Sequence, residues 1–468
     1  MNKYKKLAFN TVIFAIGSFG SKILSIMLTR FYTTYMFSED IGTKGLVEMC
    51  ANFLVPVVSF SIADAVIRYG LDENYDNRNV FSNAVVIFLF GVIGFLLLSP
   101  LLLLYSDIRP YVFLLAVFVC TSCFRQLSTQ FARARGYVKL YAADGIACTF
   151  TLLLFNILFI SILKMGVTGF MLATICSDFC SGVTVWLLAG HSRYFSRRYV
   201  DRELLGVMLR FSLPLIPTAL LWIITGFSDR VFIREMLPNG ESAQGVYELA
   251  AKVPNLISVV STIFYQAWNM SAIAEDNSKE RHSFYTQIYG AYTSVLFMAS
   301  ACVIALAKPI SAILIRQKTD PAFETVYLYT PVLVIAVLMM CLNQFLSSIY
   351  TVSKHTKNSF WTSVLAAGIN LPLNALLIPK YGIHGAVAAT FVSYFISYVV
   401  RVVDARRFIS FDINHLRFAV NLAVLFALCG VVTLAPAHKE LLLTAGVLSV
   451  FVLNFNPLME TAKKLLKR

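Results

Sequence analysis

Residues 80–105 read VFSNAVVIFLFGVIGFLLLSPLLLLY and contain no charged side chain. A helix needs about 20 consecutive, mainly apolar residues to cross the hydrocarbon core of a bilayer, and this stretch is long enough. The whole chain has the same character, with 58% hydrophobic residues and a mean hydropathy of +0.72. Charged residues make up 14% of the sequence, against roughly 25% in an ordinary soluble domain. A soluble protein of this composition would expose large apolar patches, so the sequence predicts an integral, all-α membrane protein.

The chain of 468 residues divides into about fourteen such stretches. The first is too long for the core of a secretory signal peptide and lacks a convincing cleavage site, so we expect it to be retained as a helix. The expected spans are residues 8–35, 43–68, 80–105, 110–132, 141–163, 167–190, 207–233, 244–271, 284–307, 326–351, 359–378, 383–403, 416–436 and 440–458.

The formal net charge of +14 could indicate nucleic-acid binding, but the basic residues cluster in the short gaps between apolar stretches. Nucleic acid is therefore not an expected partner. When the N-terminus is placed in the cytoplasm, cytoplasmic segments, Arg401 included, hold roughly three times as many Lys and Arg residues as the opposite side. An even number of spans returns the basic tail to the same side, so we expect both termini in the cytoplasm.

Cysteine, histidine and glycine patterns give no sign of a cofactor or metal. The nine cysteines all lie in apolar stretches and are expected to be packing residues, and the six histidines lack the spacing of metal ligands. No G-x-x-x-x-G-K-[ST] motif is present, so ATP is not the expected direct energy source. We predict no catalytic residue, no cofactor and no metal site.

The second half of the chain repeats features of the first. Three pairs lie 200 residues apart (230 − 30): Arg30 and Arg230, Gly45 and Gly245, Glu48 and Glu248. Two stretches lie 216 residues apart (382 − 166): Gly166-Val167-Thr168-Gly169 and Gly382-Ile383-His384-Gly385. Pro56 and Pro254 interrupt corresponding spans. Small residues of this kind let membrane helices approach closely, so we interpret the glycine motifs as packing elements.

A repeat of about six helices, an even number, places both lobes in the membrane in the same orientation, with a cavity between them. We expect an N-terminal lobe at 1–191, a cytoplasmic linker at 192–206, a C-terminal lobe at 207–407, and a helix pair with a basic tail at 408–468. Proteins built from such repeats bind substrate near the bilayer midplane and expose it alternately to each side, so we predict a transporter.

Charged residues inside the spans are the candidates for function, because each costs roughly 2.5–3.5 kcal/mol to insert. Some have a partner four residues away on their own helix, as in Lys44–Glu48, Asp64–Arg68 and Glu248–Lys252. The excess of cations over carboxylates predicts an anionic substrate. The cation candidates for this site are Lys22, Arg30, Arg125, Arg230 and Lys252. The carboxylates that could couple transport to a cation are Asp64, Asp229, Glu248 and Glu48.

Two motifs carry a family resemblance. The opening Asn10-Thr11, Ile16-Gly17-Ser18-Phe19-Gly20-Ser21-Lys22, Arg30 and Tyr32 resembles the start of the oligosaccharide/polysaccharide flippases (Wzx-type) of the multidrug/oligosaccharidyl-lipid/polysaccharide exporter superfamily. The stretch from Pro379 to Ala386, PKYGIHGA, followed by Ala389-Thr390, resembles their C-terminal-lobe motif. The resemblance covers essentially the whole chain and implies a MATE-like fold.

The resemblance also implies a substrate. Flippases of this family move a polyprenyl-diphosphate-linked oligosaccharide from the inner to the outer leaflet of the bacterial cytoplasmic membrane, for cell-surface polysaccharide biosynthesis. It further implies membrane lipid and the polysaccharide polymerase machinery as partners, and a cationic cavity that holds the diphosphate.

Three alternatives remain open from the sequence. A lipid II flippase for peptidoglycan differs in cargo and not in mechanism. A drug/cation antiporter of the same fold would have a cavity dominated by carboxylates and aromatic residues, whereas this one is expected to be net basic. A membrane glycosyltransferase or polymerase would need room for catalytic carboxylates, and no loop exceeds roughly 20 residues. We therefore do not expect an enzyme.

Overall fold

The computed structural model describes residues 27–466, apart from residues 73, 262–280 and 353–355. The described residues form helices and turns and contain no strand. Residues 27–35 are helical. The further α-helices are α2 (Ser38–Val58), α3 (Ile62–Gly70), α4 (Asn77–Leu98), α5 (Val112–Ala134), α6 (Val138–Asn156), α7 (Gly166–Leu188), α8 (Arg202–Ser212), α9 (Leu215–Met236), α10 (Gly240–Ala250), α12 (Arg281–Ala305), α13 (Ala307–Leu314), α14 (Val326–Val352), α15 (Thr356–Tyr381), α16 (Ile383–Ala405), α17 (His415–Leu434) and α18 (Lys439–Leu466).

Eleven helices in the described part of the chain are long and apolar enough to cross a membrane. This confirms the all-helical, multi-pass architecture. The predicted spans 8–35 and 244–271 lie partly outside the described residues, and the predicted span 207–233 corresponds to α8 and α9, which are not among the eleven. The total of about fourteen spans and the cytoplasmic position of the termini stay predictions.

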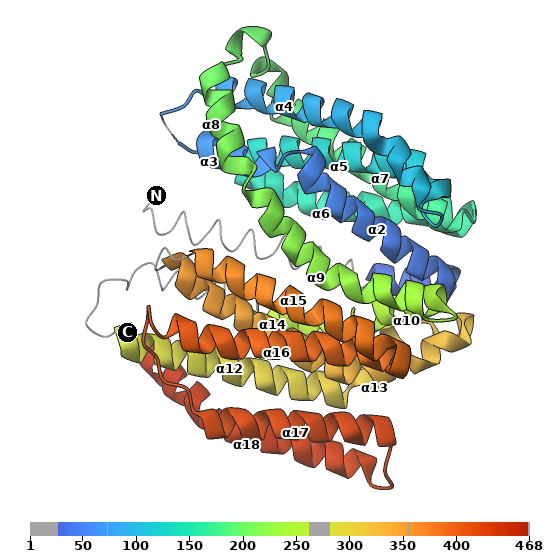
Figure 1. The fold of residues 1–468 in the computed structure, drawn as a ribbon, viewed down its shortest axis with the longest axis vertical. Helices are drawn as coiled ribbons and strands as arrows, with labels where there is room; N and C mark the ends of the chain where they lie inside the picture. Colours follow the sequence, from blue (N-terminus) through green and yellow to red (C-terminus); the bar gives the residue numbers. More distant parts are fainter. Residues whose placement is uncertain (1–26, 73, 262–280, 353–355, 467–468) are drawn as a thin grey trace. The chain divides into compact units, whose positions relative to one another are not determined.

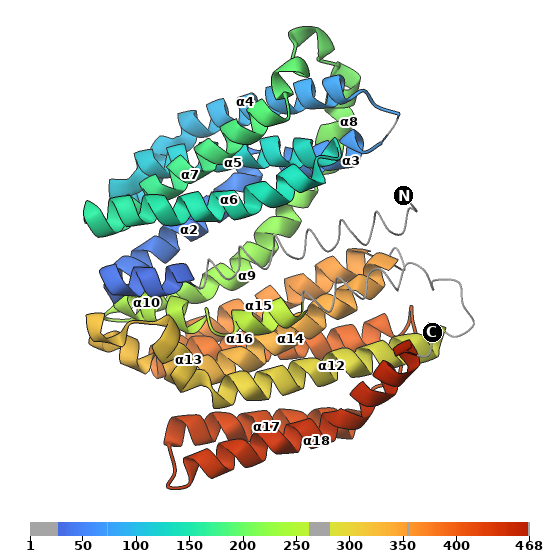
Figure 2. The same cartoon turned by 180° about the vertical axis from the view of Figure 1, so that it is seen from behind.

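The chain divides into two compact units, Met1–Ile224 and Thr225–Arg468. In the first unit α5 packs against α2, α3, α4, α6 and α7, and in the second α16 packs against α14 and α15. In Figures 1 and 2, α17 and α18 lie side by side, and both contact α12. The predicted boundaries of the lobes and of the linker stay predictions.

The core of the first unit is aromatic. Phe81 of α4 stacks on Phe131 of α5 with ring centroids 4.1 Å apart, and Trp186 of α7 lies against Phe81. Apolar residues of α3 and α8 complete this cluster. Packing in a membrane protein depends on such close contact and not on exclusion from water, because lipid is itself apolar.

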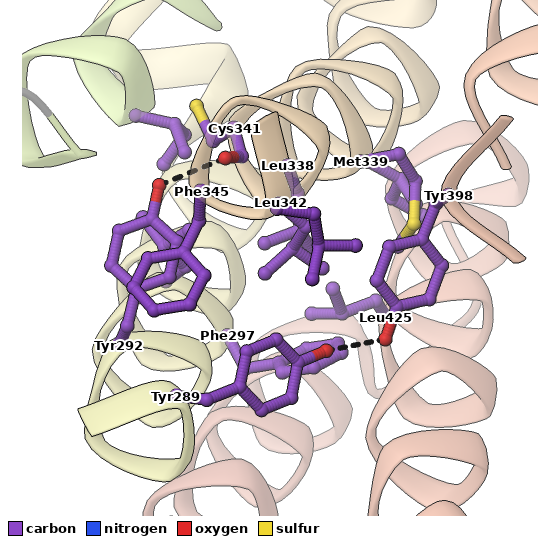
Figure 3. Close-up of a cluster of buried hydrophobic side chains, with 14 of the residues drawn as sticks. Tyr289, Tyr292, Phe297, Leu338, Met339, Cys341, Leu342, Phe345, Tyr398 and Leu425 are labelled. Carbon is purple, nitrogen blue, oxygen red and sulfur yellow. Dashed lines mark hydrogen bonds between the residues drawn. The ribbon is translucent and has the colours of Figure 1, made fainter. Parts of the chain in front are cut away.

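The core of the second unit joins α12, α14, α16 and α17 (Figure 3). Two buried tyrosines of α12 satisfy their hydroxyl groups inside it. Tyr289 shares a hydrogen bond with Tyr398 of α16, and Tyr292 donates to the carbonyl oxygen of Cys341 in α14 at 3.0 Å. A buried polar group without a partner would destabilise the core, so these bonds also fix the helices relative to one another.

The glycine motifs of the repeat have the same geometry in both units. Gly166 is the first residue of α7 and Gly382 directly precedes α16, and both have positive φ, 53° and 58°, which residues with a Cβ rarely adopt. Gly169 approaches the carbonyl oxygen of Phe159, and Gly385 approaches that of Leu377. The motifs therefore act in helix packing, as the sequence predicts.

The predicted span 43–68 is wrong as a single helix. The chain forms α2 and α3 with a break at Ser59–Ser61, where Phe60 and Ser61 have φ of 51° and 49°. Pro56 lies just before the break and lacks the N–H group that would continue the helical hydrogen-bond series. In the second unit, the helix is likewise interrupted after α10: residues 251–254 form a turn that ends at Pro254, and residues 255–261 are helical again.

Candidate functional site

A charged triad forms in the second unit where α9, α10 and the break after α10 meet. Arg230 Nε lies 2.6 Å from Glu248 Oε2, and Lys252 Nζ lies 2.6 Å from Glu248 Oε1. The side chain of Glu248 is 8% exposed, whereas those of Arg230 and Lys252 are 21% and 35% exposed. Two cations share one carboxylate, so the triad has a formal charge of +1.

The triad combines a predicted pair with a contact that the sequence did not predict. The Glu248–Lys252 pair follows from the four-residue spacing and is confirmed. Arg230 reaches Glu248 from the preceding helix and also lies 5.8 Å from the ring centroid of Tyr247. Three of the predicted site residues are therefore brought together.

Asp229, next to Arg230 in the sequence, belongs to a separate network of neutral groups. Its Oδ1 accepts from Asn370 at 3.2 Å and from Asn374 at 2.6 Å, and its Oδ2 accepts from Tyr247 at 2.7 Å and from Thr390. Four hydrogen-bond donors thus point at one carboxylate. This arrangement is typical of an ionised aspartate that the donors of α10, α15 and α16 hold in place, and it suits coordination of a metal cation less well.

Sequence reasoning missed the two asparagines. Asn370 and Asn374 lie four residues apart in α15, both are fully buried, and Asn374 Nδ2 also donates to Asn370 Oδ1 at 3.0 Å. Two amides on one face of an otherwise apolar span were the available signal, because such groups need polar partners within the membrane.

Arg125 of α5 lies between two carboxylates of the first unit. Its Nη2 is 3.4 Å from Asp144 Oδ2 in α6, its Nη1 is 3.4 Å from Asp178 Oδ1 in α7, and its Nε donates to Ser181 at 2.9 Å. Ser122 and Ser181 donate to the two carboxylates. The formal charge of this cluster is −1, so two carboxylates compensate Arg125, and its role in substrate binding stays a prediction.

Asp144 and Asp178 were likewise not predicted as site residues from the sequence. No carboxylate lies three or four residues from Arg125 on its own helix, and its partners come from two other helices. A single buried carboxylate in each of two apolar spans was the signal, since a buried charge requires a partner.

Lys44 and Glu48 form the predicted pair within α2, at 2.7 Å. Lys44 is 5% exposed, and its ammonium group lies 4.7 Å from the ring centroid of Tyr32 and 4.3 Å from that of Phe170. Glu48 is thus engaged with a cation of the chain itself, and the two aromatic rings add to the stabilisation of Lys44.

The remaining candidates are not brought into these clusters. Lys22 lies outside the described residues. Arg30 is at an exposed position of the first helix, and Asp64 is exposed on α3. The predicted pair between Asp64 and Arg68 is wrong, because no ion pair joins these two described residues.

Arg401, counted from the sequence among the cytoplasmic cations, is buried within α16 and only 1% exposed. Its guanidinium group donates to the side chains of Thr362 and Ser363 at 2.8 and 2.9 Å, and to the carbonyl oxygens of Asn343 and Ser359 at 2.7 and 3.1 Å. Four neutral acceptors thus replace solvent around this charge, which links α16 to α14 and α15.

A comparison with protein-family models identifies the family of this chain. The family model described as "Polysaccharide biosynthesis protein" matches residues 27–321. The chain belongs to this family. No curated protein matches the sequence. The predicted resemblance to a polysaccharide biosynthesis family is thereby confirmed.

Solved transporter structures share the fold. The lipid II flippase MurJ, in an inward closed conformation, matches with a TM-score of 0.74 and 14% identity, covering 97% of this chain and 100% of that one. An outward-facing multidrug resistance MATE family transporter of the MOP superfamily matches with a TM-score of 0.61 and 15% identity, covering 85% and 94%. A point mutant of the Vibrio cholerae MATE transporter VcmN matches with a TM-score of 0.57 and 15% identity, covering 86% and 96%. At these identities the similarity defines the fold alone.

Proposed function

We propose that this protein translocates a polyprenyl-diphosphate-linked oligosaccharide from the inner to the outer leaflet of the bacterial cytoplasmic membrane, by alternating access, for cell-surface polysaccharide biosynthesis. Membership of the polysaccharide biosynthesis family and the flippase-like fold support this proposal. A group with about two negative charges moving outward gains roughly 4–5 kcal/mol at 100 mV, inside negative, so the membrane potential favours this direction.

The observation that carries the proposal is the net positive triad of Arg230, Glu248 and Lys252. Arg230 and Lys252 are the more exposed members, and their common carboxylate is buried. An arriving diphosphate can bind Lys252 and one edge of the Arg230 guanidinium, while Glu248 keeps both cations in place. Guanidinium and ammonium groups form strong charge-assisted hydrogen bonds with phosphate oxygens.

The charge of the Arg125 cluster assigns it a different part in the proposal. With a formal charge of −1, the cluster of Arg125, Asp144 and Asp178 repels a diphosphate and attracts cations. We therefore assign anion binding to the second unit and add the first-unit carboxylates, which the sequence did not identify, as candidates for coupling to a cation. This cluster is also the observation that favours the drug/cation antiporter as a second candidate function.

Variants of the triad test the anion site in a deletion strain complemented with the full-length chain. Arg230→Gln and Lys252→Gln should each lower surface polysaccharide by about tenfold or more, because each removes charge-assisted hydrogen bonds worth about 1.5–3 kcal/mol. The matched control is Arg407→Gln, which removes an exposed charge whose ion pair in the described part of the chain is with Asp404. Membrane levels are compared by immunoblotting, and wild-type polysaccharide in both triad variants would contradict the anion site.

Glu248→Gln separates an anion site from a cation-coupling site. The amide oxygen of glutamine can still accept hydrogen bonds from Arg230 and Lys252, but the negative charge is lost, so diphosphate binding should be kept or strengthened. If Glu248 instead couples transport to a cation, the same change should abolish transport. The lipid precursor trapped in the deletion strain identifies the cargo. A trapped peptidoglycan precursor would favour the lipid II flippase, whose fold this chain shares.

A further inference from the structure

A cavity of about 260 Å³ lies among α12, α17 and α18, all within the second unit. Gly290 and Thr293 of α12 line one wall, and Arg417, Asn421 and Asn454 of α17 and α18 line the others. The triad of the proposed substrate site contributes no residue to this cavity, so the two sites are distinct.

Arg417 is the unusual group in this cavity. It is half-buried, and its Nη2 lies over α12, 3.8 Å from the position that a Cβ on Gly290 would occupy. Its backbone N–H is capped by Asn414 and its carbonyl oxygen accepts from Asn421, but its guanidinium group makes no hydrogen bond or ion pair with any residue that the structure describes. Five N–H donors therefore face the cavity and its margin.

The other polar groups of the cavity are already engaged. Asn454 donates to Asn421 at 2.7 Å, and each asparagine also donates to a carbonyl oxygen of its own helix. Asp412 at the rim pairs with His282 at 3.6 Å, is 73% exposed, and forms no ion pair with Arg417. Asp412 and Arg417 are the charged residues that line the cavity, and no ion pair among the described residues joins them. The half-buried Arg417 guanidinium group therefore lacks a direct anionic partner, which an anionic ligand would supply.

The surface beside the cavity is apolar. Leu416 precedes Arg417 and is 77% exposed, and Val452 of α18 is 75% exposed. Both helices are candidate membrane spans of which only a small share is buried within the protein. A ligand held by Arg417 can therefore extend acyl chains along these faces, which a soluble anion cannot do.

We propose that this cavity binds the phosphate of an anionic phospholipid of the bilayer, with Arg417 as its charged contact. The planar guanidinium group matches two phosphate oxygens at once. The hydrogen bond between Asn421 and Asn454 joins α17 to α18 at the wall of the cavity. Gly290 has no side chain and so leaves room for the headgroup next to α12. The bound lipid would fasten the C-terminal helix pair to α12.

The purified full-length chain in detergent provides the test, with native mass spectrometry to measure lipid binding. Phosphatidylglycerol should bind more tightly than phosphatidylcholine, and Arg417→Gln should weaken phosphatidylglycerol binding by about tenfold or more, as expected for loss of a charge-assisted hydrogen bond. Arg407→Gln removes an exposed charge at the end of α16 and should leave the affinity within about twofold.

A second variant keeps Arg417 and fills the cavity. Gly290→Leu places a side chain under the guanidinium group while improving helix propensity, and it should weaken phosphatidylglycerol binding to a similar degree. Unchanged affinity in both variants, or an equal loss in Arg407→Gln, would overturn the proposal. Displacement of phosphatidylglycerol by equimolar glycerol 3-phosphate would assign the cavity to a soluble phosphate and overturn the lipid assignment. None of these results bears on the triad, so this inference and the proposed function fail separately.

Discussion

His191 illustrates at the residue scale how burial without full hydrogen bonding makes stability depend on pH. Its Nε2 donates to the carbonyl oxygen of Ser128 at 2.9 Å, and its Nδ1 is buried with no partner among the described groups. The rings of Phe81, Phe131 and Trp186 surround it. Burial lowers the pKa of His191 from 6.5 to about 4, the Ser128 carbonyl opposes this shift, and the charge of Arg135 adds to it. The imidazole is therefore neutral at physiological pH.

We predict that the protein loses stability as the pH falls from about 6.5 to about 4. The unfolded chain binds a proton at His191 over this range and the folded chain does not, so the free energy of unfolding falls by up to about 1.4 kcal/mol per pH unit. Melting temperatures of wild type and His191→Phe in detergent measure the effect. The variant loses the bond to Ser128 at every pH, so the wild-type advantage should shrink as the pH drops; a constant difference would contradict the prediction.

At the element scale, the break between α2 and α3 is held by close packing. A Cβ on Gly91 of α4 would overlap the carbonyl oxygen of Val58, the last residue of α2, and would also press on the ring of Phe60. Phe60 and Ser61 are not glycine, so each positive φ costs of order 1–3 kcal/mol and persists only because the surroundings enforce it. Gly91 thus allows α4 to pack closely against the strained break between α2 and α3.

We predict that Gly91→Ala destabilises the protein by about 1–3 kcal/mol, because the new methyl group overpacks the contact with Val58. The matched control is Gly94→Ala on the same helix, where nothing lies within 4 Å of the added Cβ. That change should be neutral or stabilising by about 0.5–1 kcal/mol, since alanine is the better helix former. Thermal unfolding distinguishes the two, and equal effects would show that α4 does not support the break.

The helices themselves illustrate what sequence can and cannot predict. Hydrophobic length identified eleven spans that the described residues support, and four-residue spacing identified the Lys44–Glu48 pair, because both are properties of a single helix. The two carboxylates of Arg125 come from other helices, and no periodicity within one span reveals which neighbours it will meet. Asp64–Arg68 has the right spacing but lies on an exposed surface, where pairing gains little.

At the scale of the whole molecule, the distribution of charge predicts the topology. Cytoplasmic segments hold roughly three times as many basic residues as the opposite side when the N-terminus is inside, and this ratio orients the helices during insertion. The buried Arg401 is satisfied by neutral groups of the fold, so it is a weaker topological signal than an exposed loop residue. Removing one residue leaves the asymmetry essentially intact.

We predict that both termini lie in the cytoplasm and that the turns at residues 105–109 and 435–438 lie outside. Fusions of a fluorescent protein after residues 196 and 468 should fluoresce, because this reporter folds in the cytoplasm. Alkaline phosphatase fused after residues 107 and 437 should be active, because it requires the oxidising exterior. Both turns follow segments that the structure describes as apolar helices, Asn77–Leu104 and His415–Leu434, so each fusion counts the spans before it. If the phosphatase is active at 107 but not at 437, the number of spans between these two sites differs from the prediction by an odd number. The spans in question are then α9 and the interrupted α10, and a count of fourteen is excluded.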